Sequence, residues 1–165
     1  DAFIDYINDI GRYLMDQGRE VRIWNDGFYR LNIDNHLDLD RRFVITYWTS
    51  WNENMAPLQT FIDKGHRIVN YNDQYLYYVV GECAGYRYPS YQKIKDGFDI
   101  EVFPTRHQNI EEGQRAQKLS ADHEQFVGST FSIWSDEPKA KTEDEIMHDL
   151  INVLPAFADK FWVNL

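Results

Sequence analysis

Apolar residues recur along the chain at two spacings, one typical of helices and one typical of short strands. Between residues 2 and 17 they fall at helical spacing, and Gly18 follows where a helix C-cap belongs, so this segment is predicted to be an amphipathic helix. The same spacing predicts helices over residues 55–64, 91–95 and 142–154. Residues 142–145 have the Thr-x-x-Glu pattern of a helix start. Pro155 is expected to end that helix, with residues 157–162 continuing as a packed tail.

Short apolar runs bounded by turn residues predict strands between these helices. The predicted strands cover residues 21–24, 43–48, 67–72 and 127–134. Because strands alternate with helices, the sequence predicts βαβ units and a parallel sheet in the α/β class. No repeat or linker interrupts the pattern, so residues 1–165 are predicted to form one domain, with 104–125 as a long polar loop containing some helix. Such a set of strands fits either a small doubly wound sheet or half of an eight-stranded barrel, which takes about 250 residues when complete.

Three of the predicted strands end in a tryptophan, at Trp24, Trp48 and Trp134. In the last strand, small or polar residues alternate with apolar ones, which suits a barrel strand with its small residues inside and helices outside. Active sites of parallel α/β folds lie at the C-terminal ends of strands, so the three tryptophans are predicted to line one aromatic pocket. The alternative is that they are ordinary core residues.

The composition narrows the range of ligands. Aromatic residues make up 16% of a chain that carries a formal charge of -10 and has a pI near 4.8. An acidic surface repels phosphate backbones, so nucleic acid is not an expected partner, whereas aromatic residues suit neutral sugars that stack on rings. Cys83 is the only cysteine, no zinc motif is present, and neither a cofactor nor a metal is predicted. No apolar run approaches the roughly 20 residues of a membrane span.

Four segments carry a family resemblance. They are RIWNDG at 22–27, ITYW at 45–48, DKGHRIVNYNDQYLYYV at 63–79 and GSTFSIWSDEP at 128–138. In order and spacing they resemble the glycoside hydrolase family 20 β-N-acetylhexosaminidases, and among these the dispersin-like and bacterial surface hexosaminidase branch. The resemblance implies a (β/α)8 TIM barrel, of which this chain covers the later half, from the helix after the fourth strand to the last helix. The chain begins at Asp1 within a helical pattern and without Met, as expected of a processed or excised piece.

The resemblance also implies roles for particular side chains. The three tryptophans correspond to the aromatic walls around a terminal N-acetylhexosamine. Tyr77 corresponds to the tyrosine that hydrogen-bonds the acetamido carbonyl, and Tyr75 takes that place if the alignment shifts by two positions. Asp136 lies where the family usually has a glutamate that binds sugar hydroxyls. The substrate-binding residues expected from the resemblance are therefore Trp24, Trp48, Tyr77, Trp134 and Asp136.

The implied mechanism is substrate-assisted retention, in which the 2-acetamido oxygen attacks the anomeric carbon, an Asp orients that group and the adjacent Glu is the acid/base. In the family these carboxylates come from a His-x-Gly-Gly-Asp-Glu motif, which this sequence lacks and which would lie just upstream of Asp1. No catalytic residue is therefore assigned, and Asp26 is no substitute because Asn-Asp-Gly is typical of a turn.

The expected function is part of a secreted or cell-surface bacterial exo-β-N-acetylhexosaminidase. Its expected partners are an N-acetylhexosamine-containing glycan and the missing N-terminal half of the barrel. Two alternatives stay open: a non-catalytic glycan-binding α/β module, and a structural α/β domain whose aromatic residues are all core.

Other charged residues are predicted to be structural. Asp34, His36, Asp38 and Asp40 alternate but lack the Gly and final Glu of an EF-hand, so no metal site is assigned to them. The histidines expected to be ordinary surface or packing residues are His66, His107, His123 and His148. Solvated acidic faces are expected at Glu111-Glu112 and at Glu143-Asp144-Glu145.

Overall fold

The computed structural model describes residues 1–34, 36–105 and 117–162, and its main feature is a four-stranded parallel sheet. The strands, in the order in which they pair, are β1 (Arg22–Trp24), β2 (Val44–Tyr47), β3 (Arg67–Asn70) and β7 (Phe126–Ser129). The register pairs Ile23 with Ile45 and Ile45 with Ile68, so a row of isoleucines crosses the first three strands. The parallel sheet and the positions of these three strands are confirmed.

Helices α1 (Ala2–Asp16) and α2 (Leu58–Asp63) share one hydrophobic core with this sheet. Gly11 of α1 lies so close to the sheet that an added Cβ would be 2.1 Å from the ring of Phe43. Gly18, with φ +74, ends α1 as predicted, because a glycine enters the left-handed region without strain. The predicted helix over 55–64 instead starts at Leu58, since Pro57 disfavours helical backbone in the residue before it.

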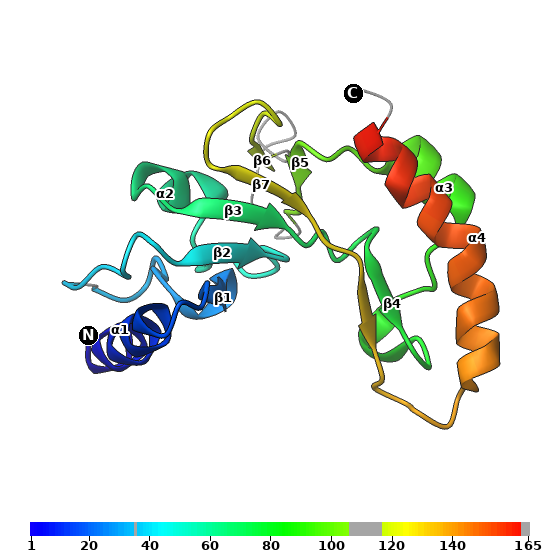
Figure 1. The fold of residues 1–165 in the computed structure, drawn as a ribbon, viewed down its shortest axis with the longest axis horizontal. Coiled ribbons are helices and arrows are strands. Elements are labelled where there is room, and N and C mark those ends of the chain that lie inside the picture. The colour runs from blue at the N-terminus through cyan, green and yellow to red at the C-terminus, as the bar shows by residue number, and fades with distance from the viewer. Residues whose placement is uncertain (35, 106–116, 163–165) are drawn as a thin grey trace.

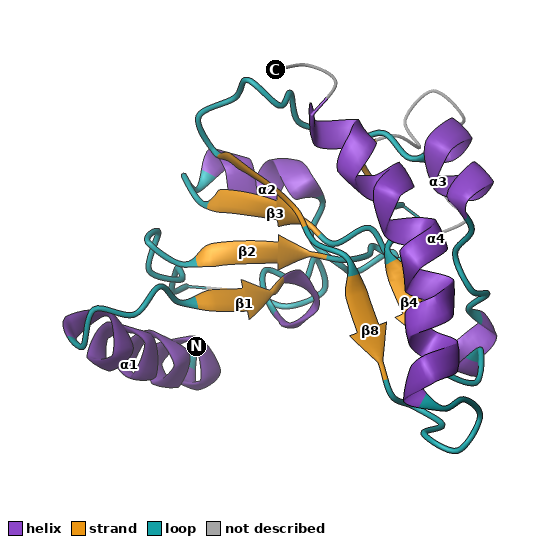
Figure 2. Ribbon diagram, turned by 45° about the vertical axis from the view of Figure 1, so that its right-hand side comes forward, coloured by secondary structure: helices purple, strands orange, loops and turns teal. Residues whose placement is uncertain are grey.

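A second, smaller sheet packs against the remaining helices (Figure 2). Strand β4 (Tyr77–Val79) pairs in parallel with β8 (Ser132–Trp134). Helices α3 (Tyr91–Gly97) and α4 (Glu143–Trp162) contribute Ile94, Val153 and Ala156 to the core behind this pair. The Tyr78 hydroxyl donates to Asp149 of α4 over 2.6 Å and so joins the small sheet to that helix.

Two short strands and two 3-10 turns complete the described chain. Strands β5 (Val102–Phe103) and β6 (Gln117–Lys118) form an antiparallel pair. The 3-10 turns η1 (Asn25–Gly27) and η2 (Cys83–Gly85) follow β1 and β4. The predicted polar loop over 104–125 thus contains β6 and no helix in its described part, and residues 106–116 lie outside the described residues.

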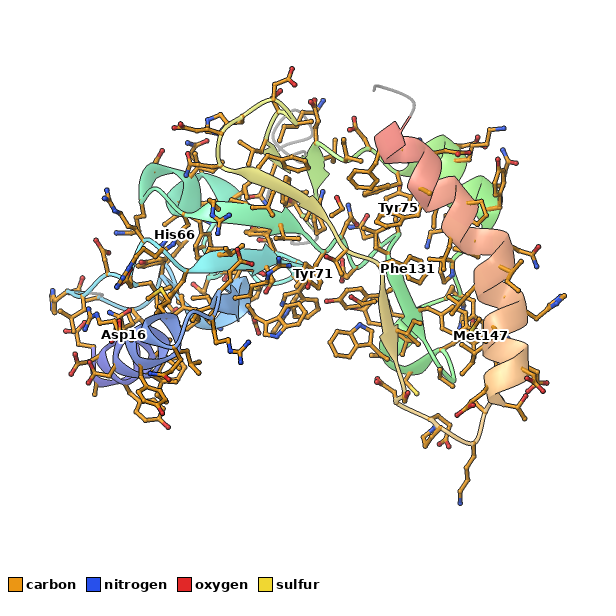
Figure 3. All side chains as sticks on the ribbon, in the orientation of Figure 1. Asp16, His66, Tyr71, Tyr75, Phe131 and Met147 are labelled. Carbon is orange, nitrogen blue, oxygen red and sulfur yellow. The ribbon has the colours of Figure 1, made fainter. Side chains whose placement is uncertain are left out.

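The predicted single strand over 127–134 is wrong, because the chain changes partner in its middle. Thr130 N donates to Asn70 O beside β3, whereas Ser132 N donates to Leu76 O beside β4. Between them, Phe131 packs into the core of α3 and α4, as Figure 3 also shows beside β8. The partner strand is itself interrupted between Asn70 and Tyr77, and β4 was not predicted from the sequence.

The prediction that Pro155 ends the last helix is also wrong. Helix α4 continues through Pro155 to Trp162. The residues beyond the proline are held by packing: Phe157 contacts the rings of Phe98 and Phe131, with centroid distances of 6.2 and 6.1 Å. This packing offsets the backbone hydrogen bond that a proline inside a helix removes.

The two sheets form an open arc and not a closed barrel. In the described ranges, β1 pairs only with β2 and β8 pairs only with β4, so each has one edge without a neighbouring strand. Figure 1 shows α1 and α4 at opposite ends of the ribbon, with the strands between them. No helix within the described residues is long and apolar enough to cross a membrane.

Candidate functional site

A cavity of about 270 Å³ lies where the two sheets meet, and its walls are mostly aromatic. It is lined by Trp24, Asp26, Trp48, Tyr77 and Trp134. Trp24 ends β1, Trp48 directly follows β2, and Trp134 ends β8, so each tryptophan comes from the C-terminal end of a parallel strand. This is the end of a parallel α/β sheet at which ligands bind. Tyr77 enters the cavity from the first position of β4.

The four rings form a chain of contacts around the cavity. The rings of Trp48 and Tyr77 are stacked, with centroids 6.1 Å apart and 4° between the planes. Tyr77 and Trp134 are tilted at 5.5 Å, and Trp134 and Trp24 at 6.0 Å. Tyr71, labelled near the middle of Figure 3, meets the edge of Trp24 at 5.0 Å and supports it from outside the cavity. Fixed rings with exposed faces are suited to stacking on a flat or apolar ligand surface.

The turn after β1 positions Trp48. Asn25 is 1% exposed; its side-chain amide donates to Thr49 O over 2.8 Å, and its oxygen accepts from Trp48 N over 3.0 Å. Next to it, Asp26 Oδ1 accepts from the indole Nε1 of Trp48 over 3.2 Å. Sequence reasoning assigned Asp26 only to a turn and so missed its place in the cavity wall. The signal for it was its position two residues after Trp24, at the same rim of the sheet.

Tyr77 keeps its proton near neutral pH. Burial raises the pKa of its hydroxyl well above the ordinary value, and the negative charge of Asp73 raises that pKa further. Asp73 accepts a hydrogen bond of 2.9 Å from the Tyr86 hydroxyl, and the Tyr86 ring lies 5.7 Å from that of Tyr77. Within the described residues the Tyr77 hydroxyl makes no hydrogen bond, which leaves its O–H as a donor for a ligand.

The structure does not bring Tyr75 or Asp136 into this cavity. Tyr75 packs against Phe98 at 6.0 Å, and its ring lies so near Gly97 that an added Cβ there would be 2.7 Å away. Figure 3 shows Tyr75 beside α4, so Tyr77 and not Tyr75 is the tyrosine of the cavity wall. Asp136 is exposed, two residues beyond the end of β8, and is not among the lining residues.

The other charged residues singled out in the sequence have structural partners or lie at the surface. Asp38 pairs with Lys64, and the Arg42 guanidinium, 2.6 Å from Asp40, holds the pKa of that carboxyl well below its usual range. His66 is buried, whereas His123 and His148 are exposed. In the described ranges no group of three or more His, Cys, Asp or Glu residues is arranged to hold a metal. His107 and Glu111-Glu112 lie outside the described residues.

The acidic start of α4 is a capping box. Thr142 N donates to Glu145 Oε2 over 2.8 Å, and Glu145 N donates to Thr142 Oγ1 over 3.3 Å. Glu143, Asp144 and Glu145 are all exposed. The predicted helix start and the solvated acidic face are therefore both confirmed here.

The parallel sheet makes the chain part of a parallel α/β domain, and the aromatic cavity at the C-terminal ends of its strands is the candidate ligand site. The particular family follows from comparison with known proteins. Residues 1–164 match the model of the glycosyl hydrolase family 20 catalytic domain, and the chain belongs to this family.

Individual relatives agree with this assignment. The chain is 26% identical over 162 residues to a lacto-N-biosidase of Bifidobacterium bifidum, covering 98% of this chain and 13% of that protein. Two structures of the pneumococcal exo-β-D-N-acetylglucosaminidase StrH superpose with a TM-score of 0.68 at 27% identity, covering 96% of this chain and 36% of theirs. Dispersin B has the same fold, with a TM-score of 0.68 at 24% identity over 93% of this chain and 46% of its own. The chain thus spans less than half of each of these relatives.

Proposed function

We propose that this chain is the later half of the catalytic barrel of an exo-β-N-acetylhexosaminidase. The whole enzyme would remove terminal N-acetylhexosamine from glycans by the substrate-assisted retaining mechanism of its family. The observation that carries the proposal is the cavity whose walls are three tryptophans, Tyr77 and Asp26, in a chain that belongs to glycoside hydrolase family 20. StrH, which is named as an exo-β-D-N-acetylglucosaminidase, shares this fold at 27% identity.

The cavity has the size and chemistry for one sugar ring. Its volume of about 270 Å³ suits a single hexosamine better than an oligosaccharide. The C–H faces of the sugar would stack on the indole rings, and burying these faces supplies most of the affinity. The Tyr77 hydroxyl, held in its neutral form, would donate to the acetamido carbonyl. Asp136 would bind sugar hydroxyls only after a movement of the segment beyond β8, because it lies outside the cavity wall.

The chain's surfaces support a partner segment that completes the barrel. One edge of β1 and one edge of β8 lack a neighbour among the described strands. On α1 the outward side chains of Phe3, Tyr6 and Tyr13 are 55%, 61% and 66% exposed, and Met147 of α4 (Figure 3) is 55% exposed. Exposed apolar faces beside open parallel edges are typical of an interface with further β/α units. The N-terminal half of the barrel is the partner that fits both.

That half would also supply the catalytic carboxylates. The cavity offers walls and a hydrogen-bond donor, but its described lining residues include a single carboxylate, Asp26, and no Asp-Glu pair. In the proposed enzyme, an Asp would orient the 2-acetamido group and the adjacent Glu would protonate the leaving oxygen. A secreted or cell-surface location in a bacterium would agree with a glycan substrate, and the relatives named above include bacterial proteins.

The second candidate is a glycan-binding module without hydrolysis. It is favoured by the same cavity and by the lack of an Asp-Glu pair among the described residues that line it. Hydrolysis of 4-nitrophenyl N-acetyl-β-glucosaminide by the full-length protein separates the two functions. Turnover with retention of configuration supports the enzyme. Binding of N-acetylglucosamine without turnover supports the module. If the protein shows no binding and no turnover, both functions are refuted.

A further inference from the structure

Asp26 is the carboxylate of the cavity wall in the part of the chain that the structure describes, and the function proposed above gives it no role. Its place is set by local structure. The 3-10 turn Asn25–Gly27 begins directly after Trp24 ends β1, so Asp26 sits at the rim of the sheet beside the C-terminal end of β2. Its side chain is half-buried and faces the cavity.

One oxygen of Asp26 fixes the ring of Trp48. Asn25 holds the backbone of Trp48 and Thr49 through hydrogen bonds of 3.0 and 2.8 Å, but a backbone contact does not set the rotamer of the indole. The bond of 3.2 Å from Trp48 Nε1 to Asp26 Oδ1 does, because it ties the indole itself to the turn that follows β1. With its indole held, Trp48 lies parallel to Tyr77, with 4° between the rings.

The other oxygen is available to a ligand. Asp26 Oδ2 has no hydrogen-bond partner among the described residues, and it is not enclosed away from solvent. An ionised carboxylate only accepts hydrogen bonds, and hydrogen bonds to charged groups are the stronger ones. The Tyr77 hydroxyl is thus a donor and Asp26 an acceptor in a cavity with flat aromatic walls. A neutral sugar carries a carbonyl for the donor and hydroxyls for the acceptor.

We propose that Asp26 has two functions in this site: Oδ1 positions the indole of Trp48, and Oδ2 accepts a hydrogen bond from a hydroxyl of the bound sugar. This deepens the proposed function and rests on it for the identity of the ligand. The positioning of Trp48 is a property of the protein alone.

Two substitutions in the full-length protein separate the functions. Asp26→Asn keeps an amide oxygen that accepts from Trp48 Nε1 but removes the charge. Asp26→Leu has similar size and no acceptor. The readouts are the near-ultraviolet circular dichroism of the coupled Trp48 and Tyr77 rings without ligand, and the affinity for N-acetylglucosamine by isothermal titration calorimetry. Asp122→Asn, which removes an exposed charge elsewhere, is the matched control.

We expect Asp26→Asn to keep the near-ultraviolet spectrum and to bind N-acetylglucosamine roughly 10-fold more weakly, since a hydrogen bond to a charged group is replaced by one to a neutral group. Asp26→Leu should change the spectrum as well and weaken binding by roughly 100-fold. The control should match the wild type in both measurements.

Wild-type affinity in Asp26→Asn would overturn the contact with the sugar, and a wild-type spectrum in a folded Asp26→Leu variant would overturn the positioning of Trp48. If the wild-type protein itself does not bind N-acetylglucosamine, the proposed function and the sugar contact both fail. The spectra of the two variants then still decide whether Asp26 positions Trp48.

Discussion

The ring of Tyr77 lies parallel to the indole of Trp48, with 4° between their planes and 6.1 Å between their centroids. Trp48 follows β2 of the main sheet, whereas Tyr77 begins β4 of the small sheet. The cavity thus exists only because the β4–β8 pair is docked against the end of the main sheet. On the side of β4 away from the cavity, the Tyr78 hydroxyl donates to Asp149 of α4.

Neighbouring tyrosines of β4 should respond differently to the same substitution. Tyr77→Phe removes a hydroxyl without a hydrogen bond to the described protein, so we expect little change in thermal stability and roughly 10-fold weaker binding of N-acetylglucosamine. Calorimetric titration and thermal unfolding of the full-length protein measure both effects. Unchanged affinity in Tyr77→Phe would show that the Tyr77 hydroxyl does not bind the sugar.

Tyr78→Phe is the matched control. Its hydroxyl donates to Asp149 over 2.6 Å, and burial raises the pKa of Tyr78 to about 12, so the group stays a donor. Its loss should reduce the free energy of unfolding by roughly 1.5 to 3 kcal/mol, the range for hydrogen bonds to charged groups, and leave sugar affinity unchanged.

His66 should make the fold sensitive to mild acid. Its Nδ1 lies 3.1 Å from Phe43 O, and its buried Nε2 has no partner among the described residues. Burial lowers the pKa of His66 below the ordinary value of 6.5, while Asp38 and Lys64 act on it in opposite directions. Because the folded-state pKa is the lower one, the stabilisation is complete above about pH 6.5 and is lost as the pH falls below it.

The measurement is the free energy of unfolding of wild type and His66→Gln between about pH 7 and pH 5. The stability advantage of the wild type should shrink toward acid, with a slope of at most about 1.4 kcal/mol per pH unit for one proton. His148→Gln, at an exposed position, should give a constant difference. A constant difference for His66→Gln as well would mean that this histidine titrates equally in the folded and unfolded chains.

Gly11→Ala should destabilise the protein although alanine favours helices. In an exposed helix this change is worth up to about 1 kcal/mol in favour of alanine. Here the new Cβ would be 2.1 Å from the Phe43 ring, so we expect a net loss of roughly 1 to 3 kcal/mol as the core shifts. Chemical denaturation of Gly11→Ala, with the exposed Asp9→Ala on the same helix as a control, tests this packing. A stabilised Gly11→Ala variant would show that α1 does not approach the sheet this closely.

The features that local sequence determines were predictable. The first three strands, the C-cap at Gly18 and the capping box at Thr142 follow from residue spacing and from groups a few positions apart. The meeting of the three tryptophans in one cavity also followed, since parallel strands bring their C-terminal ends together.

The features that depend on distant partners were not predictable. The break at Phe131 arises because β3 and β4 are separate strands, and α4 continues past Pro155 because Phe157 packs on Phe98 and Phe131. Asp26 carried the local pattern of a turn, and only the position of Trp48, directly after the next strand, gives its carboxylate a second role.

Residues 1–165 alone should not hydrolyse 4-nitrophenyl N-acetyl-β-glucosaminide. The cavity walls are present, but no carboxylate pair lies beside them in the described residues, and general acid catalysis is typically worth about 10² to 10⁴-fold. Open sheet edges would also leave the cavity wet, which weakens its hydrogen bonds. Turnover by this chain at the rate of the full-length protein, after removal of contaminating enzymes, would show that the catalytic residues lie within residues 1–165.

The sugar site itself is tested by Trp134→Ala in the full-length protein, with N-acetylglucosamine affinity from calorimetric titration set beside the free energy of unfolding. Trp134 lines the cavity at the end of β8, so its removal should weaken binding by roughly 10-fold or more. It should reduce the free energy of unfolding by less than the roughly 3 to 5 kcal/mol that truncating a core tryptophan costs. Unchanged affinity together with a full core-sized loss of stability would mean that the tryptophans form a structural core and not a binding site.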